Sequence, residues 1–432
     1  MKNKKKVHTG WRILFPVIGG IFAMLMLSMD PLITYAAEPT VIVIDPGHGG
    51  ENLGAEYDGY TEKELTLPMA KAMKEELEKY DDVIVYLTHE TDVDMSILER
   101  AEFAGEVDAD FLFCLHFNAS VNHNLYGAEV WVPSEGEYYA KGYSYAAILM
   151  EQFEEMGLYS RGVKTRLNEK GIDYYGILRY CSSEEIGVPA VLIEHCHLDN
   201  EKDKGFYTRG EEQLKEFGRQ DALAAAKYLG LTSSKTGADY SDYSYPTVEV
   251  PAKRVAPDKT APEVCRIEVT QINKETGEVT VSIEASDQDS YILYCSYSLD
   301  GGKTYSELLE WPRPAWNTSE KEHSITVTVP FEQETEIRVK AYNGFDVFKE
   351  SKSAFVAAIR DPEVKKAKEE EALQQYKNRA YEEISLLENE ETLRAPIWPV
   401  VISIGIIIFL MFFIVLFLTR NIFRLIEHSN RR

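Results

Sequence analysis

Two histidines and two glutamates stand out because each lies at the end of an apolar, strand-like run or one short loop beyond it. His48 follows VIVI in the stretch VIVIDPGHGG, His116 follows FLFCL, and Glu194 follows AVLI. Glu62 lies in TEKELTL, one short loop after His48. A catalytic zinc site needs three nitrogen or oxygen ligands, an open position for water and a nearby carboxylate. These four side chains supply that set of groups, although His48 alone is more often a structural residue and Glu62 alone is more often a surface acid.

The four residues can meet only if the chain folds so that the strand ends share one edge. Residues 39–231 alternate strand-like and helix-like patterns, which indicates an α/β domain with a mostly parallel sheet flanked by helices. Strands are expected at 40–44, 83–87, 111–115, 128–132 and 190–193. The carboxyl ends of parallel strands face one crevice. The expected fold therefore brings His48, His116 and Glu194 to the same edge of the sheet.

The motifs around these residues occur in a characteristic order. DPGHGG, EKELTL, LTHETD, MSILERAEFA, LHFNA and VLIEHCHLDN follow one another between roughly residues 40 and 230. In this order they resemble the catalytic domain of the zinc-dependent N-acetylmuramoyl-L-alanine amidases, which cleave peptidoglycan. The resemblance implies that His48, Glu62 and His116 bind Zn²⁺ and that Glu194 is the catalytic carboxylate. The expected reaction is hydrolysis of the amide between N-acetylmuramic acid and L-alanine.

Two further residues are candidates for contacts with the substrate. Asn118 is polar and follows His116 after a fully apolar run, and Arg179 lies in GIDYYGILRYC before the last strand. Arg179 could meet a carboxylate of the stem peptide, and packing of a surface loop is an equal alternative. The chain departs from the family pattern at Asn52, where many members have Asp, at His89, where many have Arg, and at residues 195–197, where a Gly-Phe-rich segment is usual. These changes leave the zinc set intact but could alter the fit of the substrate.

The second half of the chain has a different pattern. Residues 232–260 are polar and rich in Ser, Tyr and Pro, which is typical of a linker. Residues 261–360 contain short alternating strands separated by turn signals, which predicts an all-β sandwich, Ig-like or fibronectin-like. Cys265 and Cys295 lie in this part and could form a disulfide in an exported protein.

Both ends of the chain indicate export and membrane attachment. Residues 1–37 have the basic, apolar and small-residue layout of a signal peptide, with a retained N-terminal anchor as the alternative. Residues 361–394 predict a charged helical stalk, with self-association along its apolar face as an alternative. Residues 398–419 predict a transmembrane helix, and the basic tail 420–432 predicts that this end is cytoplasmic. The bulk of the chain is then extracellular at the cell membrane.

The composition narrows the range of partners and functions. With 71 acidic and 46 basic residues, the net charge of −25 argues against a nucleic-acid partner. Peptidoglycan is the expected substrate, for cell-wall remodelling. Two other functions remain open: a catalytically inactive protein that binds peptidoglycan or an envelope partner, and a zinc peptidase that cuts elsewhere in the stem peptide. The role of the β-sandwich is also open.

Overall fold

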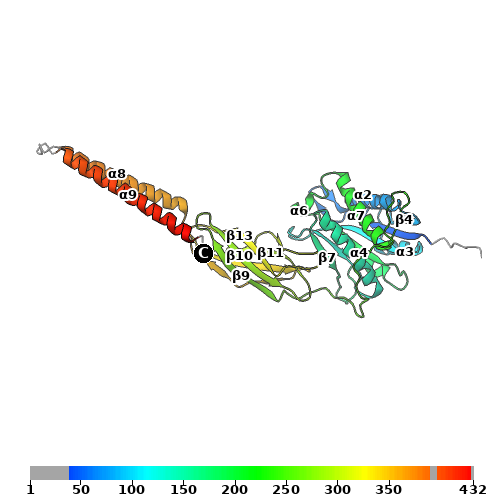
Figure 1. Ribbon diagram of the computed structural model, residues 1–432. Coiled ribbons are helices and arrows are strands. Elements are labelled where there is room, and N and C mark those ends of the chain that lie inside the picture. Colours follow the sequence, from blue (N-terminus) through cyan, green and yellow to red (C-terminus); the bar gives the residue numbers. More distant parts are fainter. Residues whose placement is uncertain (1–37, 390–396, 430–432) are drawn as a thin grey trace, which may run out of the picture. The chain divides into compact units, whose positions relative to one another are not determined.

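The computed structural model describes residues 38–389 and 397–429 (Figure 1). The expected signal segment, 1–37, lies outside the described residues. Residues 390–396, from the end of the expected stalk up to the apolar helix, and 430–432 of the basic tail also lie outside them. The chain divides into two compact units, of which the first contains 38–272, 278–329 and 334–357.

A six-stranded sheet forms the centre of the N-terminal half. Its strand order is β4-β1-β5-β8-β6-β7. The strands are β1 (Thr40–Pro46), β4 (Val83–Leu87), β5 (Phe111–Asn118), β6 (Ala128–Trp131), β7 (Ser160–Lys164) and β8 (Ala190–His197). All neighbouring pairs are parallel except β6 and β8, which are antiparallel, so the sheet is mixed.

Strand β7 was not expected from its sequence, SRGVK, because charged residues and a glycine are uncommon in a buried strand. The structure accommodates these residues by pairing their charges. Arg161 and Lys164 are buried and both bond to the carboxylate of Glu129 on the neighbouring strand β6.

Helices cover both faces of this sheet. On one face lie α2 (Glu62–Leu77), α4 (Gly136–Glu155) and α7 (Glu211–Leu229), and on the other lie α3 (Ile97–Glu106) and α5 (Gly176–Cys181). A short helix, α6 (Glu201–Lys204), follows β8, and the small hairpin β2 (Glu56–Tyr57) and β3 (Tyr60–Thr61) precedes α2. The N-terminal half is therefore an α/β domain with a helical layer on each side, as expected.

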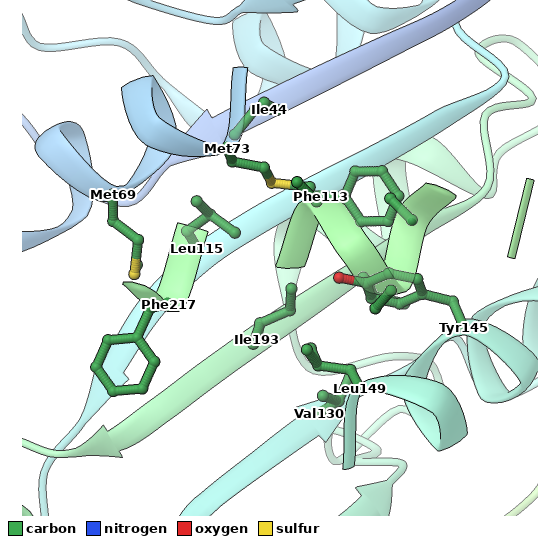
Figure 2. Packing of buried hydrophobic residues seen from close by; sticks show 14 of the residues in the cluster. Ile44, Met69, Met73, Phe113, Leu115, Val130, Tyr145, Leu149, Ile193 and Phe217 are labelled. Carbon is green, nitrogen blue, oxygen red and sulfur yellow. The ribbon is translucent and has the colours of Figure 1, made fainter. Parts of the chain in front are cut away.

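The alternation of side chains along β5 explains where its histidine points. Phe111, Phe113 and Leu115 pack into the core beneath α2, α4 and α7. Figure 2 shows Phe113 and Leu115 in this core with Met73, Tyr145, Ile193 and Phe217. Cys114 belongs to the smaller core on the α3 and α5 face. Because successive strand residues face opposite sides, His116 continues the series of Cys114 and emerges on the α3 and α5 face.

The β-rich part, residues 264–356, contains two antiparallel sheets. Their strand orders are β13-β10-β9 and β12-β11-β14-β15, with β16 paired to β14. Its strands are β9 (Val264–Ile272), β10 (Glu278–Ser286), β11 (Ile292–Ser298), β12 (Leu309–Glu310), β13 (Glu322–Thr328), β14 (Thr335–Asn343), β15 (Phe348–Glu350) and β16 (Ala354–Val356). Cys265 and Cys295 are buried and carry free thiols. The Ig-like or fibronectin-like assignment stays a prediction.

Among the residues that the structure describes, the second compact unit contains 273–277, 330–333, 358–389 and 397–429. Its helices are α8 (Pro362–Asn389) and α9 (Trp398–Ser429). Within α9, Trp398–Arg420 is 23 residues long with a mean hydropathy of 3.3, which is long and apolar enough to cross a membrane.

Candidate metal centre and active site

The structure brings three of the expected residues, His48, Glu62 and His116, into one cluster. Glu62 Oε2 lies 3.0 Å from His48 Nε2, and Glu62 Oε1 lies 2.8 Å from His116 Nδ1. One ligand atom from each residue lies within 4.8 Å of the other two. Two imidazole nitrogens and one carboxylate form the donor set that a catalytic zinc ion prefers. The side chains therefore fit the expected metal in both chemistry and spacing.

The backbone around His48 passes very close to the His116 ring. His48 adopts a left-handed conformation with φ of 67°, which is uncommon for a residue with a side chain. A Cβ atom added to Gly47 would lie 2.5 Å from His116 Cε1. The chain leaving β1 thus passes directly against the His116 ring, and only glycine leaves the space.

Asn52 and Arg100 hold the His48 ring and the His48 backbone in place through hydrogen bonds. Asn52 Oδ1 accepts from His48 Nδ1 at 3.0 Å, which leaves Nε2 directed toward Glu62. Arg100 Nη2 donates to the His48 carbonyl at 2.7 Å, and Arg100 Nη1 lies 2.7 Å from Asp45 Oδ1. Arg100 and Asp45 are both buried.

Glu62 is the first residue of α2 and is only 3% exposed. The backbone N–H groups of Ala55 and Phe117 each donate to its carboxylate at 2.9 Å. Burial alone would raise the pKa of Glu62, but the hydrogen bonds from His116 and His48 hold that pKa well below its usual range. For His48, burial acts to lower the pKa, yet the bond to Glu62 raises it above its usual value. The Glu62 carboxylate is therefore held as an anion between the two imidazole rings.

Glu194 lies beside this cluster on the neighbouring strand. It is directly opposite His116 in the pairing of β5 and β8. Its side chain is buried, and its Oε2 has no hydrogen-bond partner among the described residues. Burial, together with the nearby carboxylates of Glu62 and Glu129, raises the pKa of Glu194 well above its usual value.

The three clustered residues and Glu194 line one crevice of about 300 Å³, together with Arg100 and Tyr175. A buried carboxylate with an unbonded oxygen, in the same crevice as a candidate metal cluster, can accept and return a proton. This arrangement is suited to hydrolysis of a bond placed in the crevice.

Comparison with known proteins identifies the family. Residues 42–227 match the family model described as N-acetylmuramoyl-L-alanine amidase. The sporulation-specific N-acetylmuramoyl-L-alanine amidase of Bacillus subtilis (strain 168) is 31% identical over 197 residues, which cover 45% of this chain and 70% of the relative. The chain belongs to the N-acetylmuramoyl-L-alanine amidase family.

Other matches cover the same part of the chain. The endolysin of Bacillus phage SPP1 is 29% identical over 202 residues, covering 46% of this chain and 69% of the endolysin. Among solved structures, Cwp6 from Clostridium difficile is 29% identical with a TM-score of 0.41, over 45% of this chain and 30% of that chain. These matches cover less than half of this chain.

The two expected substrate contacts are not brought into the crevice of this amidase-family domain. Asn118 Nδ2 donates to Glu129 Oε1 at 2.7 Å, and Arg179 Nη1 donates to the carbonyls of Asp173 and Tyr174 at 2.8 Å and 3.2 Å. Neither is among the residues that line the crevice, so their contact with substrate stays a prediction.

The residues after Glu194, where the amidase family pattern differs, have partners within the protein. His195 Nε2 pairs with Asp221 Oδ2 at 2.9 Å, and its Nδ1 lies 3.0 Å from the His116 carbonyl oxygen. His197 Nδ1 lies 3.0 Å from the carbonyl oxygen of Gly127. The His195 ring thus connects α7 to the backbone of His116.

Sequence reasoning missed Arg100 and Glu129. Arg100 stands within the motif MSILERAEFA, and Glu129 within GAEVWV, where a charged residue interrupts an apolar strand. A buried charge of this kind requires a partner, and that is the signal that could have singled out both residues. Their partners, Asp45 and Arg161, cannot be identified without the fold.

Proposed function

We propose that this chain is a zinc-dependent N-acetylmuramoyl-L-alanine amidase that remodels peptidoglycan from the membrane surface. The observation that carries the proposal is the cluster of His48, Glu62 and His116 beside the buried carboxylate of Glu194, within a domain of the amidase family. A zinc ion held by the three ligands would supply Lewis-acid polarisation of the substrate carbonyl and a lowered pKa for bound water.

Glu194 performs the proton transfers in this proposal. Its carboxylate accepts a proton from the water that attacks the lactyl carbonyl carbon of N-acetylmuramic acid. As the C–N bond breaks, Glu194 returns that proton to the nitrogen of L-alanine, which leaves as an amine. The products are a free lactyl carboxylate on the sugar and a stem peptide with a free N-terminus. The burial that raises the pKa of Glu194 suits it to hold the proton between the two transfers.

The other residues orient the ligands rather than react. Asn52 and Arg100 hold the His48 ring and backbone, and the N–H groups of Ala55 and Phe117 hold Glu62. Because these contacts come from several separate elements, the ligands are preorganised before the metal or substrate arrives.

The test is digestion of purified peptidoglycan by the full chain in detergent, with and without a chelator. The proposal expects stem peptides with free alanine amines, their loss after chelation and their return after zinc is added back. Cuts within the stem peptide would favour the alternative of a zinc peptidase. Binding of peptidoglycan without any product would favour the inactive alternative.

Membrane attachment is part of the proposal. The support is the apolar helix Trp398–Arg420, followed by further basic residues at 424, 431 and 432. Positive charge favours the cytoplasmic side, so the amidase domain would lie outside the cell with peptidoglycan. Protease added to intact protoplasts is expected to digest the amidase domain. Full protection of that domain would contradict this orientation.

A further inference from the structure

A cluster of buried charges lies on strands β6 and β7, next to the crevice. Arg161, Glu129 and Lys164 are each at most 3% exposed. Glu129 Oε2 accepts from Arg161 Nε at 2.8 Å and from Lys164 Nζ at 2.7 Å. The single Glu129 carboxylate therefore pairs with two cations, which leaves one positive charge in excess. Buried charges are tolerated only when they are paired, so this cluster calls for a second anion.

The β-rich part supplies the second anion. Asp346, in the turn between β14 and β15, places Oδ2 2.6 Å from Arg161 Nη2. Tyr294 of β11 accepts from Arg161 Nη1 at 3.2 Å, and the Tyr291 hydroxyl donates to the Arg161 carbonyl at 2.7 Å. Residues more than 100 positions away in the sequence thus contact both the guanidinium and the backbone of Arg161.

Both the β-rich part and strand β7 have local features that permit this contact with Arg161. The turn that carries Asp346 is held by the buried Asn343, whose Oδ1 accepts from the N–H groups of Phe345 and Val347 at 3.0 Å. On the sheet, Gly162 has a φ of 88°, and a Cβ there would lie 1.9 Å from the Tyr291 hydroxyl. Only glycine permits this approach of the tyrosine to β7.

Glu129 connects the charge cluster to the active site. Its other oxygen, Oε1, accepts from Asn118 Nδ2 at 2.7 Å. Asn118 is two residues beyond His116 on β5, and Glu129 lies directly opposite Glu194 in the pairing of β6 and β8. A shift of the Glu129 carboxylate would therefore displace its neighbours on β5 and β8, the strands that carry His116 and Glu194.

We propose that the β-rich part completes the active site: Asp346 neutralises Arg161 and thereby fixes Glu129 and Asn118 beside Glu194. Asp346, Arg161 and Glu129 are positioning residues, because none of them lines the crevice. This inference rests on the proposed amidase function. The competing explanation is that the ion pair only joins two parts of the chain, in which case its loss would lower stability and leave the turnover of folded protein unchanged.

The test compares single variants of the full chain in detergent on a soluble N-acetylmuramoyl-peptide. Asp346→Asn removes the charge and keeps the shape, Asp346→Glu keeps the charge, and Glu275→Gln is a matched control at an exposed acid in the β9–β10 turn. We expect Asp346→Asn to lower kcat about tenfold or more, with KM within about twofold and zinc content unchanged. Asp346→Glu should recover at least about a third of kcat, and the control should match the wild type.

A folded Asp346→Asn protein with the kcat of the wild type would overturn the inference. If that variant does not fold, Tyr294→Phe decides, because it removes the bond from Arg161, together with the bond that the Tyr294 hydroxyl donates to the Tyr126 carbonyl, and retains the charge balance. A kcat reduced about threefold in Tyr294→Phe supports positioning, and an unchanged kcat overturns it. A wild-type protein that binds zinc but releases no stem peptide would refute the proposed function itself.

Discussion

His116 and Glu194 lie directly opposite each other on the neighbouring parallel strands β5 and β8. His116 is bonded to Glu62 in the candidate metal cluster, and Glu194 is buried with an oxygen that has no hydrogen-bond partner among the described residues. The pairing register of two strands thus places the proposed proton acceptor next to a proposed metal ligand.

Replacing Glu194 with Gln should abolish hydrolysis without releasing the metal. The amide keeps the size of the side chain but cannot accept a proton, and Glu194 is not one of the three proposed ligands. We expect activity to fall by about 10²- to 10⁴-fold. Metal analysis of the purified variant should give the zinc content of the wild type. Wild-type activity, or loss of the zinc, would contradict the role assigned to Glu194.

Zinc affinity should rise with pH over the range in which His48 loses its proton. The bond to Glu62 raises the pKa of His48, so this histidine stays protonated to a higher pH than the usual value of about 6.5. Zinc must displace that proton, so affinity should grow up to about tenfold per pH unit below the His48 pKa and level off above it. Competition titrations with a zinc chelator between about pH 6 and 8 would show this slope. A flat profile would mean that His48 binds no zinc.

Replacing Arg100 with Met should destabilise the protein strongly. The change leaves the buried Asp45 carboxylate without its cation and removes the bond to the His48 carbonyl. We expect the free energy of unfolding to fall by about 3–5 kcal/mol, measured by urea denaturation. Arg219→Met is the matched control, because Arg219 is partly exposed and pairs with Glu216 on the same helix. That control should lose less than about 1 kcal/mol. Equal losses in the two variants would contradict the account of Arg100.

Replacing Gly47 with Ala should weaken metal binding. The added methyl group would lie 2.5 Å from the His116 ring, so the ring or the β1 end must move. We expect zinc affinity to fall about tenfold or more, measured by calorimetry. Gly105→Ala is the comparison, since its Cβ would meet Ile186 at an ordinary 3.4 Å. If both variants bound zinc as the wild type does, the close approach would have no functional importance.

Much of this site could be predicted from the sequence because its main residues follow apolar runs. His48, His116 and Glu194 end strands, and the rule for parallel sheets then places them at one edge. Strand β7 escaped prediction because its charges are compensated by residues that are distant in the sequence. The pair of Arg161 and Asp346 spans 185 positions, and no local pattern in the sequence connects the two.

Hydrolysis in H₂¹⁸O, followed by mass spectrometry of the products, tests the central claim most directly. The account predicts that one ¹⁸O atom enters the lactyl carboxylate of N-acetylmuramic acid, that the stem peptide carries an unlabelled C-terminus, and that Glu194→Gln gives neither product. Label in a peptide carboxylate, with the lactyl amide intact, would contradict the account.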